Sequence, residues 1–306
     1  MSSKLTDRGR NEFALAVVKY CLVIVLLVCS SVVKAQVGND QVPLLPSYLW
    51  NTTSFFNPSQ RIRTTDWAMT ARYRGLTGAL KEINQLEIGG NISLKEIHQV
   101  NAVGVFSKIG PYISVNRFGL SYAVKVPLSN MWDAVLGMSA LLTQYSLAST
   151  TAGPGGSSGG FDGAFGGALI HERWEFAIAT NQVFESSVRP LNFEYALNRY
   201  HQAYVSRVSD LSPDFKLGTV VYYRYLELDR DDFVGSCQLT YKDALEVGGS
   251  YHPGEGISPQ LAVNYEKKAL NYRLVLSYFL PLGLTTKHIR TPAYEVTLWV
   301  FQKPRD

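Results

Sequence analysis

The stretch from 233 to 242 reads FVGSCQLTYK, and its side chains change character at every step. One set of alternate positions is apolar, aromatic or small, and the set between them is mostly polar. The two sets are Phe233, Gly235, Cys237, Leu239 and Tyr241, and Val234, Ser236, Gln238, Thr240 and Lys242. Successive side chains of a β-strand point to opposite faces, so a period of two places each set on its own face. The stretch predicts a strand with one apolar and one polar face.

The same period recurs between Trp67 and Phe301, and segments with turn chemistry separate the repeats. The pattern predicts about a dozen to fourteen strands, with uncertain boundaries over 86–111 and 182–208, and helical periodicity is not evident. Turn segments lie at 229–232, 242–244 and 266–268. We expect the glycine-rich residues 153–160 to form a flexible loop at the membrane surface. The chain is therefore predicted to be all-β.

Two architectures use such strands, a soluble β-sandwich and an outer-membrane barrel. The barrel requires charges on the lumen-facing polar phase, and that phase contains Arg72, Arg74, Lys125, Glu175, Lys216, Arg224, Lys242, Glu246, Glu266, Arg273 and Glu295. It also requires aromatic girdles near strand ends, which these residues can form: Tyr112, Trp132, Trp174, Tyr241, Tyr251, Tyr265, Tyr272, Tyr278 and Trp299.

A barrel also needs a last strand that pairs with the first. Residues 294–301 read YEVTLWVF and alternate almost to the end of the sequence. We therefore predict a transmembrane antiparallel β-barrel of about 14 strands over residues 64–306, with outer-membrane lipid around its apolar face.

Residues 1–35 predict a signal peptide. A basic leader precedes the apolar run 21–33, which is shorter than the roughly 20 residues that cross a bilayer. The sequence VKA follows, so cleavage is expected between Ala35 and Gln36. A lipid anchor at Cys29 and a retained N-terminal anchor are the alternatives.

Cleavage at that point would leave 24 basic and 23 acidic residues, with Cys237 as the one cysteine. The near-neutral charge argues against a dedicated nucleic-acid binder, and a lone cysteine forms no internal disulfide.

Residues 36–63 differ from the rest, because they contain three prolines and no sustained alternation. Trp50, Phe55 and Phe56 favour a plug inside the barrel, since an exposed aromatic tail is costly. A disordered leader is the alternative.

Motifs for metal, cofactor or catalytic chemistry are not recognisable. The histidines have no metal-ligand spacing, and residues 229–232 lack the acid spacing and glycine of a calcium loop; the histidines are His98, His171, His201, His252 and His288. The glycine-rich stretch lacks the Lys-Ser/Thr ending of a phosphate-binding loop. We expect no metal, no cofactor and no enzymatic activity, although a Ser-His-acid triad assembled from different strands stays open.

Several short segments resemble the PorP/SprF-like family of outer-membrane proteins associated with type IX secretion and gliding motility in Bacteroidota. The N-terminal resemblance consists of Tyr48 and Asn51 followed by Asn57 and Pro58, and Ser59 stands where the family usually has alanine. Residues 197–213 are similar to the family's mid-chain strand and turn. The closing strand is similar at Tyr294, Glu295, Val296 and Leu298, and continues to Phe301.

The resemblance implies a bacterial outer-membrane barrel that binds the C-terminal domain of a secreted adhesin, or another type IX component, and presents or anchors it. Three functions follow for testing. The first is this non-enzymatic anchor, the second is a plugged transporter for hydrophobic or small solutes, and the third is an outer-membrane hydrolase. A lumen filled by the N-terminal segment and paired charges would favour the anchor, whereas a buried Ser-His pair at the rim would favour the hydrolase.

Overall fold

A computed structural model describes residues 57–60, 66–78, 81–94, 97–150, 153–191, 194–226, 231–282 and 292–302. In these ranges, no helix is both long and apolar enough to span a membrane. The predicted signal peptide with its Ala35 and Gln36 junction lies outside the described residues, as do Tyr48 and Asn51. These assignments stay predictions.

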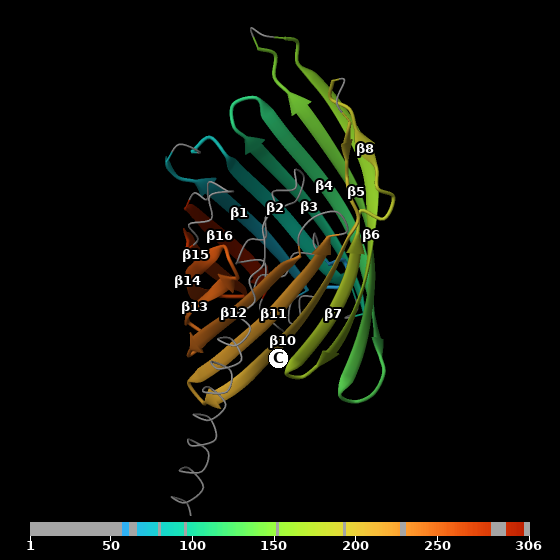
Figure 1. The fold of residues 1–306 in the computed structure, drawn as a ribbon. Coiled ribbons are helices and arrows are strands. Elements are labelled where there is room, and N and C mark those ends of the chain that lie inside the picture. Colours follow the sequence, from blue (N-terminus) through green and yellow to red (C-terminus); the bar gives the residue numbers. More distant parts are fainter. Residues whose placement is uncertain are drawn as a thin grey trace, which may run out of the picture.

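Fourteen strands form one closed antiparallel barrel, in which each strand pairs with its neighbours and β1 pairs with β16 (Figure 1). The barrel strands are β1 (Trp67–Leu76), β2 (Asn84–Leu94), β3 (His98–Ile109), β4 (Ile113–Pro127), β5 (Trp132–Leu147), β6 (Gly156–His171), β7 (Trp174–Asn181), β10 (Tyr200–Ser212), β11 (Phe215–Leu226), β12 (Asp232–Tyr241), β13 (Leu245–His252), β14 (Gly256–Lys267), β15 (Leu270–Pro281) and β16 (Ala293–Gln302). Two short strands, β8 (Ser187–Val188) and β9 (Tyr195–Ala196), pair separately. The predicted barrel of about 14 strands is confirmed.

The two faces of the strands differ as their sequence pattern predicts. In β12, Val234, Ser236 and Gln238 are buried toward the lumen, whereas Cys237 and Leu239 are exposed on the outer face. Large apolar side chains are exposed in the same way around the barrel, including Met69, Ile88, Leu120, Leu136, Ile178, Val247, Leu261 and Leu276. An apolar surface this extensive is covered by lipid in an outer-membrane barrel. The closed barrel excludes the β-sandwich alternative.

The connections between strands give the orientation of the barrel. At the end where β1 begins and β16 ends, the connections are short: 95–97, 128–131, 172–173, 213–214, 242–244 and 268–269. The opposite end has shorter connections at 110–112, 227–231 and 253–255, but it also has all the long ones, at 77–83, 148–155, 182–199 and 282–292. Outer-membrane barrels have short periplasmic turns and longer extracellular loops. We therefore assign the first end to the periplasm and the second to the cell surface.

The glycine-rich stretch is the sequence prediction that the structure corrects. Residues 156–160 are not a flexible loop; they begin β6 and pair with residues 143–147 of β5. Glycine has a weak propensity for strands, but backbone hydrogen bonds to β5 hold this segment in a strand conformation. A Cβ at Gly156 would overlap the Pro190 carbonyl, and one at Gly160 would lie 3.0 Å from Val188 Cγ1. The glycines are needed because another segment packs closely over them.

Candidate functional site

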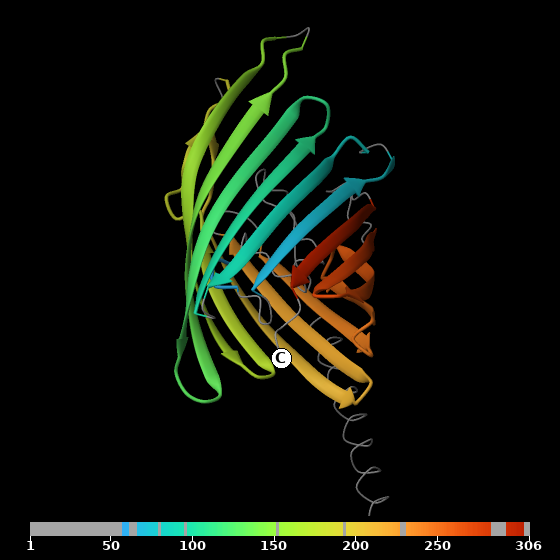
Figure 2. The same ribbon diagram turned by 180° about the vertical axis from the view of Figure 1, so that it is seen from behind.

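Three strands rise above the rest of the barrel at the extracellular end. Figures 1 and 2 show the β5–β6 hairpin as the tallest part of the wall, with β4 beside it. β5 and β6 have 16 residues each, whereas β1 has 10. We call residues 113–117 of β4, 143–147 of β5 and 156–160 of β6 the extracellular extension.

The outer face of the wall changes from apolar to polar where the extension begins. Phe118, Leu142 and Phe161 lie side by side in the ladder and are exposed. One rung further out the row continues with Asn116 and Gln144, and Gln144 donates to Ser157 Oγ at 3.3 Å. Because a lipid-facing band must be apolar, this change marks the outer limit of the membrane. The extension therefore stands in water.

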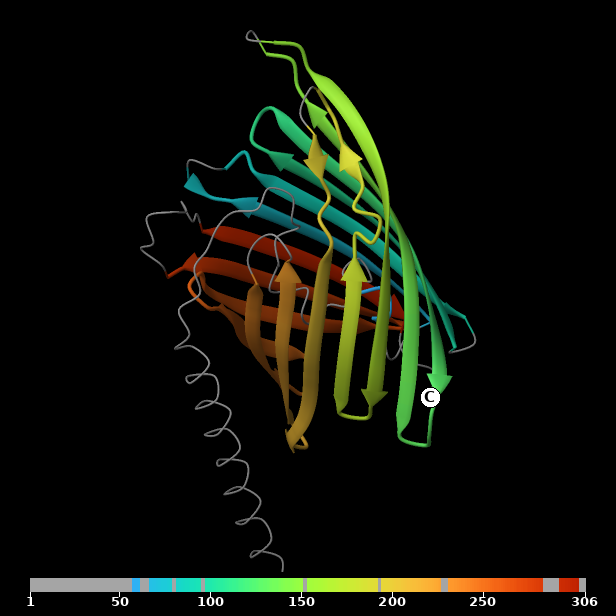
Figure 3. The same ribbon diagram turned by 45° about the vertical axis from the view of Figure 1, so that its right-hand side comes forward.

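The inner face of the extension is covered by residues 182–191 and 194–199, which contain β8 and β9 and which we call the β8–β9 hairpin (Figure 3). Val188 and Leu197 of the hairpin form a buried cluster with Val115 and Tyr145 of the wall. The Tyr145 and Tyr195 rings stack with centroids 5.7 Å apart. The extension thus has a hydrophobic core of its own outside the membrane.

The start of the hairpin is fixed by one buried carboxylate. Asp162 Oδ1 accepts the backbone N–H groups of Gly163 at 2.7 Å and Phe184 at 3.0 Å, and Oδ2 accepts that of Ser186 at 3.2 Å. Three hydrogen bonds to one buried side chain hold the backbone at this point. The hairpin is therefore a defined surface rather than a loose loop.

The tip of the hairpin presents charge to water. Arg189 and Glu194 are exposed and form an ion pair with 2.5 Å between Nη2 and Oε2. A hydrogen bond from Ser187 and then one from Arg189 lower the pKa of Glu194, because both favour its charged form.

In the lumen, a buried ion cluster joins the first and last strands. Arg72 Nη1 donates to Glu87 Oε1 at 3.0 Å, and Arg72 Nε lies 3.6 Å from Glu295 Oε1. Arg72 Nε also donates to Thr297 Oγ1 at 3.2 Å. Arg72 and Glu87 are 1% and 0% exposed. The cluster lies across the seam where β16 meets β1, and it contains Glu295, one of the predicted closing-strand residues.

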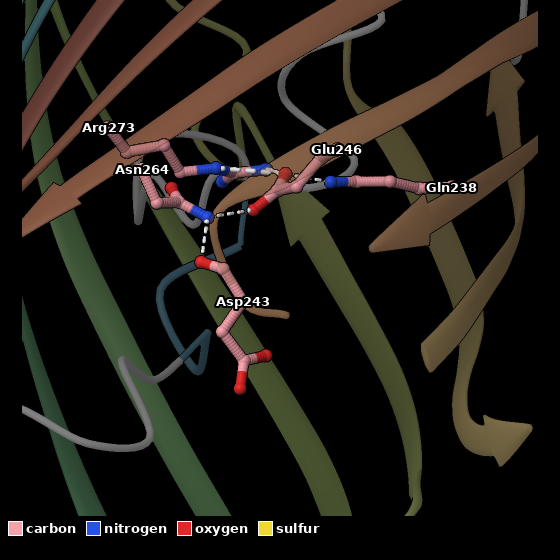
Figure 4. A network of polar contacts seen from close by, with 5 residues as sticks. All are labelled: Gln238, Asp243, Glu246, Asn264 and Arg273. Atoms are coloured by element: carbon pink, nitrogen blue, oxygen red, sulfur yellow. Dashed lines mark hydrogen bonds and ion pairs between the residues drawn. The ribbon is translucent and has the colours of Figure 1, made fainter. Parts of the chain in front are cut away.

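A second lumen network centres on Glu246 (Figure 4). Its carboxylate accepts hydrogen bonds from the Arg273 guanidinium, from the Gln238 amide and from Asn264 Nδ2, the last at 2.7 Å. Asn264 Nδ2 also donates to the Asp243 carbonyl at 2.9 Å. The four strands β12 to β15 each contribute one side chain, so the network ties this part of the wall together.

Some buried lumen charges were absent from the sequence prediction. Glu87 lies in β2, where the strand boundaries were uncertain, and Asp162 follows the stretch interpreted as a loop. Arg117 near the outer end of β4 was also missed. One signal would have revealed β2: the polar residues Gln85 and Glu87 alternate with the apolar residues Leu86 and Ile88.

Within the predicted plug, the structure describes residues 57–60, including Asn57 and Pro58 of the family-like motif. Ser59 N and Oγ both donate to Asn57 Oδ1, at 2.9 and 2.7 Å, and Gln60 N donates to the Asn57 carbonyl at 3.0 Å. These bonds make a β-turn with proline at its second position, a conformation that proline favours. Asn57 and Ser59 are 2% and 0% exposed.

The 57–60 turn lies against the inner wall of the barrel. A Cβ at Gly137 of β5 would be 2.5 Å from Ser59 N, and one at Gly166 of β6 would be 3.2 Å from Ser59 Oγ. We call Gly137 and Gly166 the glycine notch. Gln99 Nε2 of β3 also donates to the Gln60 carbonyl at 3.5 Å. This part of the predicted plug is therefore inside the lumen; the rest of residues 36–63 stays a prediction.

A serine and a histidine meet at the extracellular end of β13. Ser250 Oγ lies 3.2 Å from His252 Nε2, and the two residues are 5% and 6% exposed. No group of three or more His, Cys, Asp or Glu side chains suited to a metal ion occurs among the described residues. This contact between Ser250 and His252 is relevant to the hydrolase hypothesis, because a serine hydrolase needs a serine next to a histidine.

Comparison with solved structures shows the same fold in outer-membrane proteins. A Pseudomonas aeruginosa FadL homologue superposes with a TM-score of 0.54 at 9% identity, over 84% of this chain and 94% of that one. The TodX deltaS2S3 mutant monoaromatic hydrocarbon channel gives 0.53 at 10%, over 81% and 93%. The CymD monoaromatic hydrocarbon channel gives 0.51 at 12%, over 81% and 91%. At these identities the likeness concerns the fold.

No curated protein matches the chain. A family model, by contrast, matches nearly all of it, over residues 37–299. That model describes type IX secretion system membrane proteins, and a closed barrel with an apolar outer face agrees with an outer-membrane location. The chain belongs to the PorP/SprF family of type IX secretion system membrane proteins.

Proposed function

We propose that this protein is a non-enzymatic outer-membrane barrel that binds a secreted type IX substrate, such as an adhesin C-terminal domain, and anchors it at the cell surface in secretion or gliding. Membership of the family associates the chain with the secretion machinery. The observation that carries the finer proposal is the extracellular extension with the β8–β9 hairpin on its inner face.

The extension supports partner binding because a pore has no need of it. Strands that only cross the membrane can end with the apolar band, at Leu142 and Phe161. Here the ladder continues to Leu147 and Gly156, and the hairpin gives it a buried core and a charged tip. A rigid surface loses little conformational entropy when a partner binds. The geometry therefore favours a docking surface.

The lumen supports the anchor over the transporter. The 57–60 turn is buried inside it, and the surrounding wall contains the Arg72 and Glu246 ion clusters. Charged groups held in buried ion pairs are a poor lining for a hydrophobic solute. The monoaromatic hydrocarbon channels among the structural matches share the fold, and they leave transport of small solutes as the alternative function.

Capture from outer membranes tests the anchor, with two matched charge reversals. Arg189 on the hairpin and Arg173 in a periplasmic turn are both exposed and each forms one surface ion pair, with Glu194 and Asp210 respectively. Arg189→Glu is expected to reduce recovery of a secreted protein with a type IX C-terminal domain, whereas Arg173→Glu leaves it unchanged.

Two results would overturn the anchor. One is loss of the partner with Arg173→Glu alone, which would place binding on the periplasmic side and indicate another secretion component. The other is recovery of no type IX protein with any variant, together with solute-dependent conductance in bilayers, which would indicate the transporter.

A further inference from the structure

Two backbone N–H groups of the 57–60 turn, those of Ser59 and Gln60, find their hydrogen-bond acceptors within the turn. Its closing hydrogen bond runs from Gln60 N to the Asn57 carbonyl, and the Asn57 side chain accepts from Ser59. Among the described residues, its one hydrogen bond to the barrel is the 3.5 Å contact between Gln99 and the Gln60 carbonyl. Such a turn can leave the wall at the cost of this one long hydrogen bond, while the bonds that close the turn stay intact.

The turn is held against the wall by shape complementarity. Gly137 and Gly166 are direct partners in the β5–β6 ladder, and the same rung continues with Ala123 of β4 and Ala179 of β7. Small side chains along one rung leave a recess in the wall, and the turn fills it. Glycine inside a strand weakens it and marks a place where another part of the chain approaches closely.

The two glycines differ in which atom a Cβ would meet, although the nearest atom is equally close at both. At Gly137 a Cβ would overlap the Pro58 carbonyl group, which is backbone and moves only if the turn moves. At Gly166 the nearest atom is Asn57 Oδ1, at the end of a side chain. Gly167 is the next residue of β6 and lies on the outer face. A Cβ added there would be 3.8 Å from its nearest neighbour, Leu136 Cδ2, which is an ordinary van der Waals distance.

We propose that the 57–60 turn is a displaceable constriction of the lumen, held in the glycine notch by shape. With the turn seated, the recess in the wall is filled and the lumen is narrowed at this level, since Asn57 and Ser59 are almost completely buried there. When the turn leaves the notch, the recess becomes part of an open path. This inference concerns the lumen and does not depend on partner binding at the extension.

The test uses the full-length protein with Ser59→Cys in a background in which Cys21, Cys29 and Cys237 are each replaced by alanine. A bulky maleimide added to the folded protein reports on burial of the thiol at position 59, and conductance in planar bilayers reports on the lumen. Gly137→Ala is expected to increase both labelling and conductance. Gly167→Ala is the matched control, and it is expected to change neither.

Heat-dependent migration on gels verifies that each variant is folded. If Gly137→Ala does not fold, Asn57→Ala replaces it. Loss of Asn57 Oδ1 removes both hydrogen bonds from Ser59 and so loosens the turn without any change in the wall. Unchanged labelling in the folded variants would overturn the proposal. Increased labelling without increased conductance would also overturn it, since the turn would then move without constricting the lumen.

Discussion

Gly137 and Gly166 face each other across the β5–β6 ladder, and the space left by their missing side chains holds the 57–60 turn. The turn contains the Asn57 and Pro58 of the N-terminal motif. A short motif and two glycines about 80 and 110 residues further along the chain therefore form one structural unit.

The two glycines are expected to differ in their tolerance of a methyl group. Gly137→Ala should lower the free energy of unfolding by about 1–3 kcal/mol, because the new Cβ meets rigid backbone. Gly166→Ala should cost less, because the Asn57 side chain can rotate. Urea unfolding in lipid vesicles, followed by tryptophan fluorescence, measures both. Equal losses would mean that the turn shifts as a rigid unit.

Arg72 is expected to be essential for stability at the seam. Arg72→Met leaves Glu87 and Glu295 buried without their arginine, and breaking a buried pair costs about 3–5 kcal/mol. Arg173→Met removes the ion pair with Asp210, whose side chains are 57% and 54% exposed. We expect it to lower the free energy of unfolding by about 1 kcal/mol or less. The same unfolding measurement compares them. A small effect of Arg72→Met would contradict the role of this ion cluster in the stability of the seam.

The limit of the membrane can be located with two lysines on one face of β5. Leu136→Lys places a charge within the apolar band and should cost about 2–4 kcal/mol, whereas Gln144→Lys in the extension should cost about 0–1 kcal/mol. Unfolding from vesicles measures the difference. A cost of about 2–4 kcal/mol at both positions would place the extension inside the bilayer.

Ser250 and His252 form the kind of buried pair at the rim that would favour the hydrolase. We nevertheless expect Ser250 to be unreactive, because side chains only 5% and 6% exposed leave a substrate little access. A fluorophosphonate probe should leave the folded protein unlabelled, as it should the Ser250→Ala variant. Labelling of the wild-type chain that Ser250→Ala abolishes would contradict the non-enzymatic proposal and support the hydrolase.

The β8–β9 hairpin is expected to loosen in acid. The pKa of Glu194 is below the ordinary value of 4.5 in the folded protein, so its charged form favours the folded hairpin. This contribution is present above that value and is lost as the pH falls through the folded pKa. Amide hydrogen exchange of the hairpin should therefore increase relative to the barrel strands as the pH falls below 4.5. Glu194→Gln should remove the pH dependence, and persistence of the dependence would assign it to another group.

The sequence alone determined the architecture. Alternation with a period of two is a local property, and the β12 stretch FVGSCQLTYK shows it without any knowledge of neighbouring strands. Together with charges such as Arg72 and Glu246 on the polar phase, it was enough to predict a lipid-facing barrel of about 14 strands. The family resemblance rested on equally local motifs.

Only the tertiary structure decided what the glycines do. In the sequence, residues 156–160 have the composition of a loop, and Gly137 and Gly166 are unremarkable within strands. Their role depends on which segment lies over them, the hairpin in one case and the 57–60 turn in the other. Contacts of this kind join residues far apart in the chain, and no local pattern encodes them. The same holds for Glu295, which meets Arg72 because the last strand of the barrel pairs with the first.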